Sequence, residues 1–302
     1  MDFGLLGLGR MGTTLSALAV ERGHRAVAWD PSDDARRGAA EQGVDTCADV
    51  AEVVDALGAP RVVLLSVPHG EVVDADLDQL RGVLGEGDLV ADLGNSHWER
   101  SMRRAEELAA DGIRFVDVGT SGGTSEAPGW TGAAFMAGGA AEDVERIRPL
   151  LCDLADDPGA VHHAGPSGAG HFVKLVHNAI EFGMIQSIAD GVELLRRSDF
   201  DLDLAALFEH WNHGTVIRSW LVELMGVALR QEPDLDHLST YVEDTGEVKW
   251  VLAWALANDV PVPAVEAAQR ALMAYRDADR QAAKAVALMR HQFGGHPVHR
   301  AS

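Results

Sequence analysis

Cysteine is scarce in this sequence, and long apolar runs are missing from it. Cys47 and Cys152 are the only cysteines in 302 residues, too few for a disulfide framework, so we expect a cytoplasmic protein. No apolar run approaches the roughly 20 residues that a membrane-spanning helix needs. Met1 leads into a strand-like segment rather than a basic and apolar leader, so we expect no signal peptide and no membrane partner.

Lysine is nearly missing as well, and basic residues are outnumbered. Lys174, Lys249 and Lys284 are the only lysines, and 47 acidic residues oppose 25 lysines and arginines, giving a net charge of −22. This charge disfavours nucleic acid and anionic membranes as partners, because both are polyanions. An acidic surface with few lysines also predicts a halophilic protein, since a salt-rich cytoplasm screens the self-repulsion.

The first 30 residues have the order strand, glycine-rich turn, helix, strand, acid. Residues 2–6 and 25–29 are apolar and strand-like, and the turn between them reads GLGRMG at 7–12, followed by a helix to about Arg22. This is the full context of a dinucleotide-binding turn, although a purely structural glycine turn is the alternative. The three glycines allow a tight turn, close approach of a pyrophosphate to the helix N-terminus, and close packing of helix on strand.

Asp30 decides which dinucleotide is expected. A carboxylate at the end of the second strand accepts hydrogen bonds from a ribose 2′-hydroxyl and repels a 2′-phosphate, so NAD is favoured over NADP. Arg36 and Arg37 leave NADP open, because a nearby arginine can hold a 2′-phosphate. The predicted cofactor-binding residues are Gly7, Leu8, Gly9, Arg10, Met11, Gly12, Asp30, Val67, Pro68 and Asn95.

Strands and helices continue to alternate after Asp30, which predicts an α/β fold with a Rossmann-type doubly wound sheet. Apolar strands are expected at 61–67, 89–93, 113–118, 131–138 and 160–163. Three of them end in polar or glycine-rich turns, at 67–69, 94–96 and 121–123. Ligands of such sheets lie beyond the carboxyl ends of the strands, so these turns are expected to line one crevice; ordinary turn chemistry is the alternative for each.

The second half of the chain reads as helical. We expect a domain boundary near Ala164, with a dinucleotide-binding domain at 1–164 and an all-helical substrate and dimerisation domain at 165–302. The expected helices lie at 165–195, 202–211, 216–229, 248–258, 263–275 and 280–290, before an extended tail. The histidine pairs at 162–163 and 210/213 lack companions at metal-ligand spacing, and no metal is predicted.

The long helix at 165–195 carries the candidate catalytic residues. Lys174, His177, Asn178 and Glu181 are spaced i, i+3, i+4 and i+7, which puts them on one helix face. Burial lowers the pKa of a lysine and raises that of a glutamate, so the two residues are a candidate base and acid. The alternative is a solvent-facing stripe of salt bridges. Retention of a lysine in a chain with only three favours the catalytic interpretation, because arginine cannot accept the proton.

Six motifs together resemble a known family. They are GLGRMG at 7–12, GNS at 94–96, SGG at 121–123, GAGHFVKLVHNAIEFG at 168–183, DTGEVKW at 244–250 and RHQFGGH at 290–296. The N-terminal half resembles the β-hydroxyacid dehydrogenases, and the whole chain is similar to the short, decarboxylating 6-phosphogluconate dehydrogenases. The resemblance implies oxidation and decarboxylation of 6-phosphogluconate in the pentose phosphate pathway, with Lys174 as the general base and Glu181 as the acid.

The resemblance also implies a substrate site that this sequence only partly retains. The implied substrate-binding residues are Asn95, Ser121, Gly122, Gly123, His177, Asn178, Arg276, Arg290 and His296. Phe182 stands where the family has a phosphate-binding tyrosine, and DTGEVKW lacks one of the family's phosphate-binding lysines. In the family the last two cations come from the partner's tail, which implies a homodimer with exchanged tails. A dehydrogenase of non-phosphorylated acids, such as 3-hydroxyisobutyrate or a sugar acid, and a non-catalytic NAD-binding regulator are the alternatives.

Overall fold

A mostly parallel sheet forms the centre of the N-terminal unit of the computed structural model, which describes all residues except 124–126, 128–129, 277–284, 287–288 and 290–302. Within the described residues the strand order is β3-β2-β1-β4-β5-β6-β7-β8. The strands are β1 (Asp2–Leu6), β2 (Arg25–Trp29), β3 (Asp45–Thr46), β4 (Val62–Leu65), β5 (Leu89–Asp92), β6 (Arg114–Ser121), β7 (Ala134–Gly138) and β8 (Val161–Gly165). The order reverses between β1 and β4, which creates the crevice expected of a doubly wound sheet.

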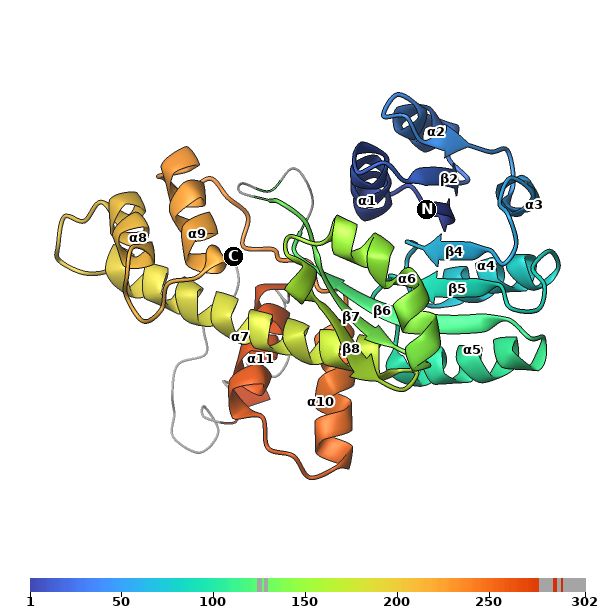
Figure 1. Ribbon diagram of the computed structural model, residues 1–302. Coiled ribbons are helices and arrows are strands. Elements are labelled where there is room, and N and C mark those ends of the chain that lie inside the picture. Colours follow the sequence, from blue (N-terminus) through green and yellow to red (C-terminus); the bar gives the residue numbers. More distant parts are fainter. Residues whose placement is uncertain (124–126, 128–129, 277–284, 287–288, 290–302) are drawn as a thin grey trace. The chain divides into compact units, whose positions relative to one another are not determined.

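Helices cover both faces of this sheet (Figure 1). The helices of the two faces are α1 (Arg10–Glu21), α2 (Asp33–Ala40) and α6 (Ala141–Leu154) on one side and α3 (Val50–Asp55), α4 (Glu71–Arg81) and α5 (Trp98–Ala110) on the other. Because side chains alternate along a strand, Phe3 and Leu5 of β1 pack in the first core, whereas Leu6 packs in the second. The doubly wound α/β fold predicted from the sequence is therefore confirmed.

Strand β7 breaks the parallel pattern that the sequence suggests. It pairs antiparallel with β6, from Asp117 opposite Gly138 to Ser121 opposite Ala134, and then parallel with β8. The connection from β7 to β8 contains α6, the kind of helical crossover that a parallel pair requires. Periodicity within a strand carries no signal for its direction, so only the connections distinguish the two arrangements.

Helix α4 carries a charged residue on its buried face. Val73, Leu77 and Leu80 of this face belong to the core beneath the helix, and Asp76 lies among them with only 6% of its surface exposed. Burial, and then the nearby charge of Asp30, raise the pKa of Asp76 from 3.8 to about 6. Within the described residues its carboxylate has no hydrogen bond or ion pair, so its charged form lowers the stability of the fold.

Because the pKa of Asp76 is raised, we expect an uncharged residue at this position to stabilise the fold by an amount that depends on pH. The folded state binds this proton more tightly than the unfolded state, so the stability contribution of Asp76 falls as the pH rises from about 4 to about 6. We expect Asp76→Asn to raise the free energy of unfolding by about 2 kcal/mol at pH 7.5 and by almost nothing below pH 4. Urea unfolding at both pH values measures this, with the exposed Asp78→Asn of the same helix as the matched control; equal gains for the two variants would contradict it.

The chain divides into two compact units, Met1–Ala179 and Ile180–Ser302, called here the N-terminal and C-terminal units. The division falls within the long helix α7 (Ala169–Arg196), whereas the sequence suggests a boundary at its start. The reason is local, since the first turns of α7 pack directly on strands of the sheet.

The C-terminal unit is helical in its described part, as the sequence predicts. After α7 it contains α8 (Leu204–Asn212), α9 (Trp220–Gln231), α10 (Glu247–Ala257) and α11 (Pro263–Arg276). Val192, Phe208, Val222 and Leu229 form a small core among α7, α8 and α9. Most of the helix expected at 280–290 and all of the tail at 292–302 lie outside the described residues. In the described part of the chain, no helix combines the length and apolar character needed to cross a membrane.

Candidate functional site

The glycine-rich turn has the geometry that a dinucleotide requires. Gly7 has a φ of +96°, and its N–H donates to the carbonyl of Trp29 at 2.9 Å. A Cβ on Gly12 would lie 2.1 Å from the Gly7 carbonyl oxygen, so only glycine fits there. A Cβ on Gly9 would meet no protein atom within 4 Å, and Gly9 caps α1 without a side-chain hydrogen bond. The space in front of this helix N-terminus is therefore open to a pyrophosphate.

Asp30 is fixed at the end of β2 by two backbone donors. Leu8 N–H donates to Oδ2 and Ser32 N–H donates to Oδ1, each at 2.8 Å. The carboxylate is thus tied directly to the glycine turn, in the position where a ribose would follow a pyrophosphate. The two arginines that left NADP open both face acidic neighbours. Arg36 bonds to Asp33 and to the carbonyl of Asp30, and Arg37 bonds to Asp34.

Gly9 offers a test of the cofactor site that leaves the fold intact. We expect Gly9→Ala to weaken dinucleotide binding about tenfold or more, because the added methyl group occupies the path of the pyrophosphate. Stability should change little, since the methyl group meets no protein atom. Fluorescence titration with NADH and thermal unfolding measure the two effects. Unchanged NADH affinity would show that the pyrophosphate does not lie on this turn.

The turns after β4, β5 and β6 follow one another along the carboxyl edge of the sheet. A Cβ on Gly94 would lie 3.1 Å from the carbonyl oxygen of Val67, and the hydroxyl of Thr120 donates to the carbonyl of Leu93 at 3.3 Å. Asn95 lies half-buried in the second of these turns. The predicted residues Val67, Asn95 and Ser121 therefore lie along one edge, as expected for a crevice, while Pro68 is exposed.

Three glycines bring the start of α7 into direct contact with the sheet. A Cβ on Gly119 of β6 would lie 2.3 Å from the Cβ of Lys174. A Cβ on Gly170 of α7 would lie 2.4 Å from the carbonyl oxygens of Asp117 and Met136, and one on Gly138 would lie 2.6 Å from the Gly170 nitrogen. No side chain separates helix from strand at these points. Lys174 is thereby seated on β6, two residues before the strand ends at Ser121.

The polar stripe of α7 faces the protein. Lys174 is 7% exposed and Asn178 is also buried, whereas the apolar Val173 and Ile180 are 39% and 57% exposed. The solvent-facing alternative is therefore wrong for Lys174 and Asn178. His177, one turn after Lys174, shares a hydrogen bond of 3.2 Å between its Nε2 and the Ser121 hydroxyl.

Glu181 lies one further turn along the same helix, in the C-terminal unit, and is half-buried.

Gly122 and Gly123 follow Ser121 with positive φ values of +130° and +74°. These backbone conformations favour glycine, which fits the SGG pattern of this turn.

The contact between Gly119 and Lys174 can be tested by one methyl group. We expect Gly119→Ala to lower kcat about 100-fold, because the added Cβ displaces Lys174 and a shift of about 1 Å from productive geometry has that effect. Gly58→Ala, where a Cβ meets nothing within 4 Å, is the matched control and should leave kcat within about twofold of the wild type. Equal rates for the two variants would contradict the proposed seat of Lys174.

Buried polar residues with no recognisable motif in the sequence hold the start of α7. The carboxylate of Asp117 accepts from Gly168 N–H at 2.6 Å and from His171 N–H at 2.9 Å, which caps the helix N-terminus. His171 Nε2 donates to the carbonyl of Asp92 at 3.1 Å, so its Nδ1 accepts from the Ser101 hydroxyl at 2.7 Å. An acidic residue within an apolar strand is the signal that could have indicated this role for Asp117.

The buried side chain of Arg104 in α5 connects the turn after β4 with the turn after β5. Its side chain is 1% exposed, and its Nη2 donates to the carbonyl of Gly70 at 2.9 Å. Its Nε donates to Asp74 at 2.8 Å, and its Nη1 lies 3.1 Å from the Ser96 hydroxyl. Ser96 in turn donates to the Asp92 carboxylate at 2.7 Å. This network could not be predicted from the sequence, because its members are distant along the chain.

The carboxylate of Asp244 pairs with two cationic side chains in the C-terminal unit. Its buried carboxylate lies 2.6 Å from Lys249 Nζ and 3.7 Å from Arg276 Nη1, and it accepts from Gln269 at 3.1 Å. Burial alone would raise the pKa of Asp244, but Lys249, the Gly246 N–H and Gln269 hold it below its usual range. Arg276 also stacks over Tyr241, 5.5 Å from the ring centroid. Arg276, which the resemblance assigns to the phosphate, and Lys249 are thus both engaged by a carboxylate.

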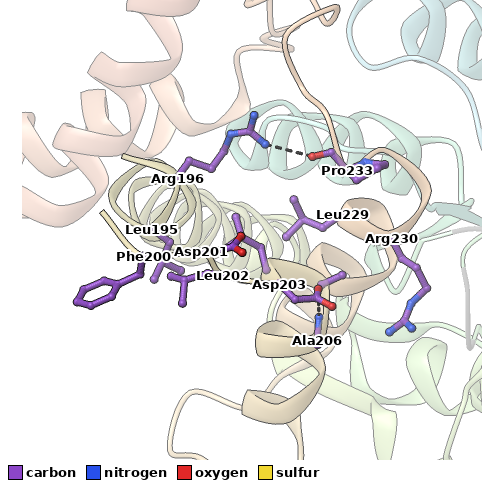
Figure 2. Close-up of a pocket in the computed structure, with 12 residues that line it drawn as sticks. Leu195, Arg196, Phe200, Asp201, Leu202, Asp203, Ala206, Leu229, Arg230 and Pro233 are labelled. Carbon is purple, nitrogen blue, oxygen red and sulfur yellow. Dashed lines mark hydrogen bonds between the residues drawn. The ribbon is translucent and has the colours of Figure 1, made fainter. Parts of the chain in front are cut away.

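A hollow of the C-terminal unit lies among the end of α7, α8 and the end of α9 (Figure 2). Its polar groups serve local structure, since Asp203 caps α8 and Arg196 donates to the carbonyl of Pro233 at 3.2 Å. Arg290 and His296 lie outside the described residues, so their roles stay predictions. Within the described residues, no group of three or more histidine, cysteine, aspartate or glutamate side chains is placed to hold a metal ion.

Matches to known proteins cover nearly the whole chain. Residues 2–165 match the family described as the NAD binding domain of 6-phosphogluconate dehydrogenase, and residues 170–299 match the 6-phosphogluconate dehydrogenase C-terminal domain. The NAD(+)-dependent, decarboxylating 6-phosphogluconate dehydrogenase of Haloferax volcanii is 39% identical over 301 residues, with 99% of each chain covered.

Two solved structures have the same fold. The Plasmodium falciparum 6-phosphogluconate dehydrogenase, described in apo form and in complex with NADP+ and with 6-phosphogluconate, superimposes with a TM-score of 0.83 at 25% identity. The match covers 100% of this chain and 66% of the Plasmodium chain. Mycobacterium tuberculosis 3-hydroxyisobutyrate dehydrogenase gives a TM-score of 0.70 at 24% identity, over 91% of this chain and 92% of that one.

Proposed function

The chain belongs to the 6-phosphogluconate dehydrogenase family, and from this premise we propose that it converts 6-phosphogluconate to ribulose 5-phosphate and CO₂ with NAD as oxidant. The observation that carries the proposal is the buried Lys174, seated on Gly119 at the carboxyl edge of the sheet. An amine in this setting suits general-base chemistry, because burial disfavours the charged form. Asp30 supports NAD rather than NADP, since its carboxylate would repel a 2′-phosphate.

Lys174 performs the first proton transfer in this proposal. When bound, NAD accepts the hydride that leaves C3 of the substrate. Lys174 takes the proton of the 3-hydroxyl as the C3 carbonyl forms, which gives a 3-keto acid. Ser121, His177 and Asn178 are proposed to hold the substrate carboxylate and hydroxyls beside this amine. The hydrogen bond between Ser121 and His177 supports this assignment, because it fixes both side chains before substrate arrives.

Decarboxylation follows from the ketone that the first step creates. The bond from C2 to the carboxylate breaks, and its electron pair delocalises into the C3 carbonyl as an enolate. The protonated Lys174 stabilises the developing oxyanion by a charge-assisted hydrogen bond. Glu181, two turns further along α7, then supplies a proton to the carbon that lost CO₂, which becomes C1 of ribulose 5-phosphate.

The engagement of Asp244 favours a second candidate function. If Lys249 and Arg276 stay paired with Asp244, the site offers less positive charge to a substrate phosphate. A non-phosphorylated hydroxy acid would then be the better substrate, with the same base and the same hydride transfer. Phe182 supports this alternative as well, because it offers no hydroxyl to a phosphate.

Steady-state kinetics with three acids separate the two candidates. We expect kcat/KM for 6-phosphogluconate to exceed that for gluconate and for 3-hydroxyisobutyrate, with NAD preferred to NADP. Equal or higher efficiency with gluconate or 3-hydroxyisobutyrate would overturn the phosphorylated substrate. Asp244→Asn is informative in either case, because it releases Lys249 and Arg276 and should favour phosphorylated over non-phosphorylated acids.

We also propose a homodimer. The C-terminal unit exposes large apolar side chains along the second half of α7, among them Ile180, Met184, Ile185 and Leu194. Several exposed apolar side chains on one helix support an interface with a second copy of the chain. Light scattering of the purified protein after size exclusion should give twice the chain mass of 32.2 kDa, and a monomer would contradict the proposal.

A further inference from the structure

The charged side chain of Arg36 lies at the corner of the crevice where the ribose of a dinucleotide is expected. Helix α2 begins at Asp33, directly after the turn that follows β2, and Arg36 is on its first turn. Arg36 Nη1 donates to the backbone carbonyl of Asp30, and the carboxylate of Asp30 accepts from Leu8 N–H of the glycine turn. Asp30 thus joins the guanidinium to the turn that faces the pyrophosphate. We call Asp30 and Arg36 together the ribose corner.

A guanidinium at the ribose corner has the chemistry of a phosphate receptor. Its planar array of five N–H donors matches the oxygens of a phosphate, and it stays charged at every working pH. Within the described residues its hydrogen bonds go to the Asp30 carbonyl and to the Asp33 carboxylate. The carbonyl carries no net charge, so it holds Arg36 in place without neutralising it. Arg36 by itself would therefore attract a ribose 2′-phosphate, the group that distinguishes NADP from NAD.

Asp33 removes this attraction, because its carboxylate is paired with the same guanidinium. Asp33 Oδ1 accepts a hydrogen bond from Arg36 Nη2, and the i, i+3 spacing puts the two side chains on one face of α2. The ion pair has no net charge. The ribose corner is therefore left with the negative charge of the Asp30 carboxylate, which repels a phosphate and accepts hydrogen bonds from ribose hydroxyls.

A second ion pair on α2 provides a comparison, because it lies away from the ribose corner. Asp34 and Arg37 have the same residue types, the same i, i+3 spacing and the same kind of hydrogen bond. Both acids lie in the first turn, where negative charge favours the helix N-terminus. The Arg37 side chain is 70% exposed and bonds to Asp34, whereas that of Arg36 is 21% exposed and also bonds to Asp30. Support of the helix is common to both pairs, and of the two only Asp33–Arg36 reaches the ribose corner.

We propose that Asp33 is a specificity-determining residue, which withholds the Arg36 guanidinium from a ribose 2′-phosphate and so helps the crevice to select NAD over NADP. The inference rests on the proposed function, because it takes the crevice to bind a dinucleotide with its ribose at Asp30. Asp30 supplies repulsion of the phosphate, and Asp33 cancels an attraction that would offset this repulsion. NAD carries a hydroxyl in place of the phosphate, so the pairing of Arg36 has little effect on its binding.

Direct binding measurements test this role without any turnover. The full chain and its variants are titrated with NADH and with NADPH at pH 8 and fixed salt, and the ratio of the two dissociation constants is compared. We expect Asp33→Asn to shift this ratio toward NADPH about fivefold, because it releases a guanidinium from an exposed ion pair. Asp34→Asn removes the same charge from the same turn and should change the ratio less than twofold.

A double variant shows whether Asp33 acts through Arg36. In the background of Arg36→Leu there is no guanidinium to release, so Asp33→Asn should then change the ratio less than twofold. Leucine keeps the apolar part of the arginine stem, and Ser32 still caps the helix, so α2 should remain folded. Arg36→Gln, which is polar and equally uncharged, should give the same result. A fivefold shift with and without Arg36 would overturn the inference, because Asp33 would then repel the phosphate directly.

The outcomes separate this inference from the proposed function. An unchanged ratio in Asp33→Asn, with NADH still bound, overturns the role of Asp33 and leaves the proposed function standing. Equal shifts in Asp33→Asn and Asp34→Asn overturn it as well, because they indicate net charge alone. A wild type that prefers NADPH contradicts the role of Asp33 together with the choice of NAD. Failure of the wild type to bind either dinucleotide contradicts both the inference and the proposed function.

Discussion

Replacement of Lys174 by methionine should lower kcat with the preferred acid about 1,000-fold, with little change in the affinity for NADH. Methionine keeps the length and the apolar character of the lysine stem on Gly119, but it removes the proton acceptor. Loss of a positioned general base reduces rates by factors of about 100 to 10,000. The glycine turn and Asp30 are untouched, so dinucleotide binding should persist. Initial rates and fluorescence titration of the same preparation measure both quantities.

Lys174→Arg distinguishes a base from a cation at this position. Arginine keeps the positive charge but does not release its proton, so it should be as inactive as the methionine variant. A rate near that of the wild type would show that charge, rather than proton transfer, is what position 174 supplies. Full activity in both variants would show that a group other than Lys174 accepts the proton.

Replacement of Arg104 by leucine should destabilise the protein by about 3–5 kcal/mol. The substitution leaves the buried Asp92 carboxylate without its guanidinium partner and removes the donor to the Gly70 carbonyl. Breaking a buried ion pair from one side has an effect of this size, because the remaining charge stays desolvated. Chemical unfolding measures the loss. We also expect a raised KM for substrate, since Ser96 and the neighbouring Asn95 lose their support.

Arg103 is the matched control, one residue earlier on the same helix. Its side chain is 55% exposed, and it pairs only at the surface, with Glu107 at 3.4 Å and with Asp74 at 3.9 Å. Exposed ion pairs contribute little to stability, so Arg103→Leu should change the free energy of unfolding by less than about 0.5 kcal/mol. Similar losses in both variants would mean that α5, rather than the buried network, is what the substitutions disturb.

The local features of the fold could be predicted from the sequence, because each depends on neighbouring residues. The alternating strands and helices, the glycine turn and the polar face of α7 all follow from spacing along the chain. The positive φ of Gly7 and the close approach at Gly12 agree with the roles that the GLGRMG pattern indicates. The burial of Lys174 agrees with the catalytic interpretation of the polar face of α7 and differs from a solvent-facing stripe of salt bridges.

The features that could not be predicted depend on residues far apart in the sequence. Arg104 and Asp92 meet only because α5 packs against the sheet, and the cap of α7 comes from Asp117, which lies some 50 residues earlier. The direction of β7 depends on its connections rather than on its residues. The departure of DTGEVKW from the family motif is visible in the sequence, but the pairing of Asp244 with Lys249 and Arg276 depends on the packing of α10 and α11.

The stoichiometry of a single reaction tests the central claim most directly. Purified protein is incubated with a limiting amount of 6-phosphogluconate and excess NAD, and NADH and CO₂ are measured in the same vessel. We predict one NADH and one CO₂ for each 6-phosphogluconate consumed, with neither product formed by Lys174→Met on the same timescale. NADH without CO₂, or no NADH from this substrate while a non-phosphorylated acid is oxidised, would contradict the proposed reaction.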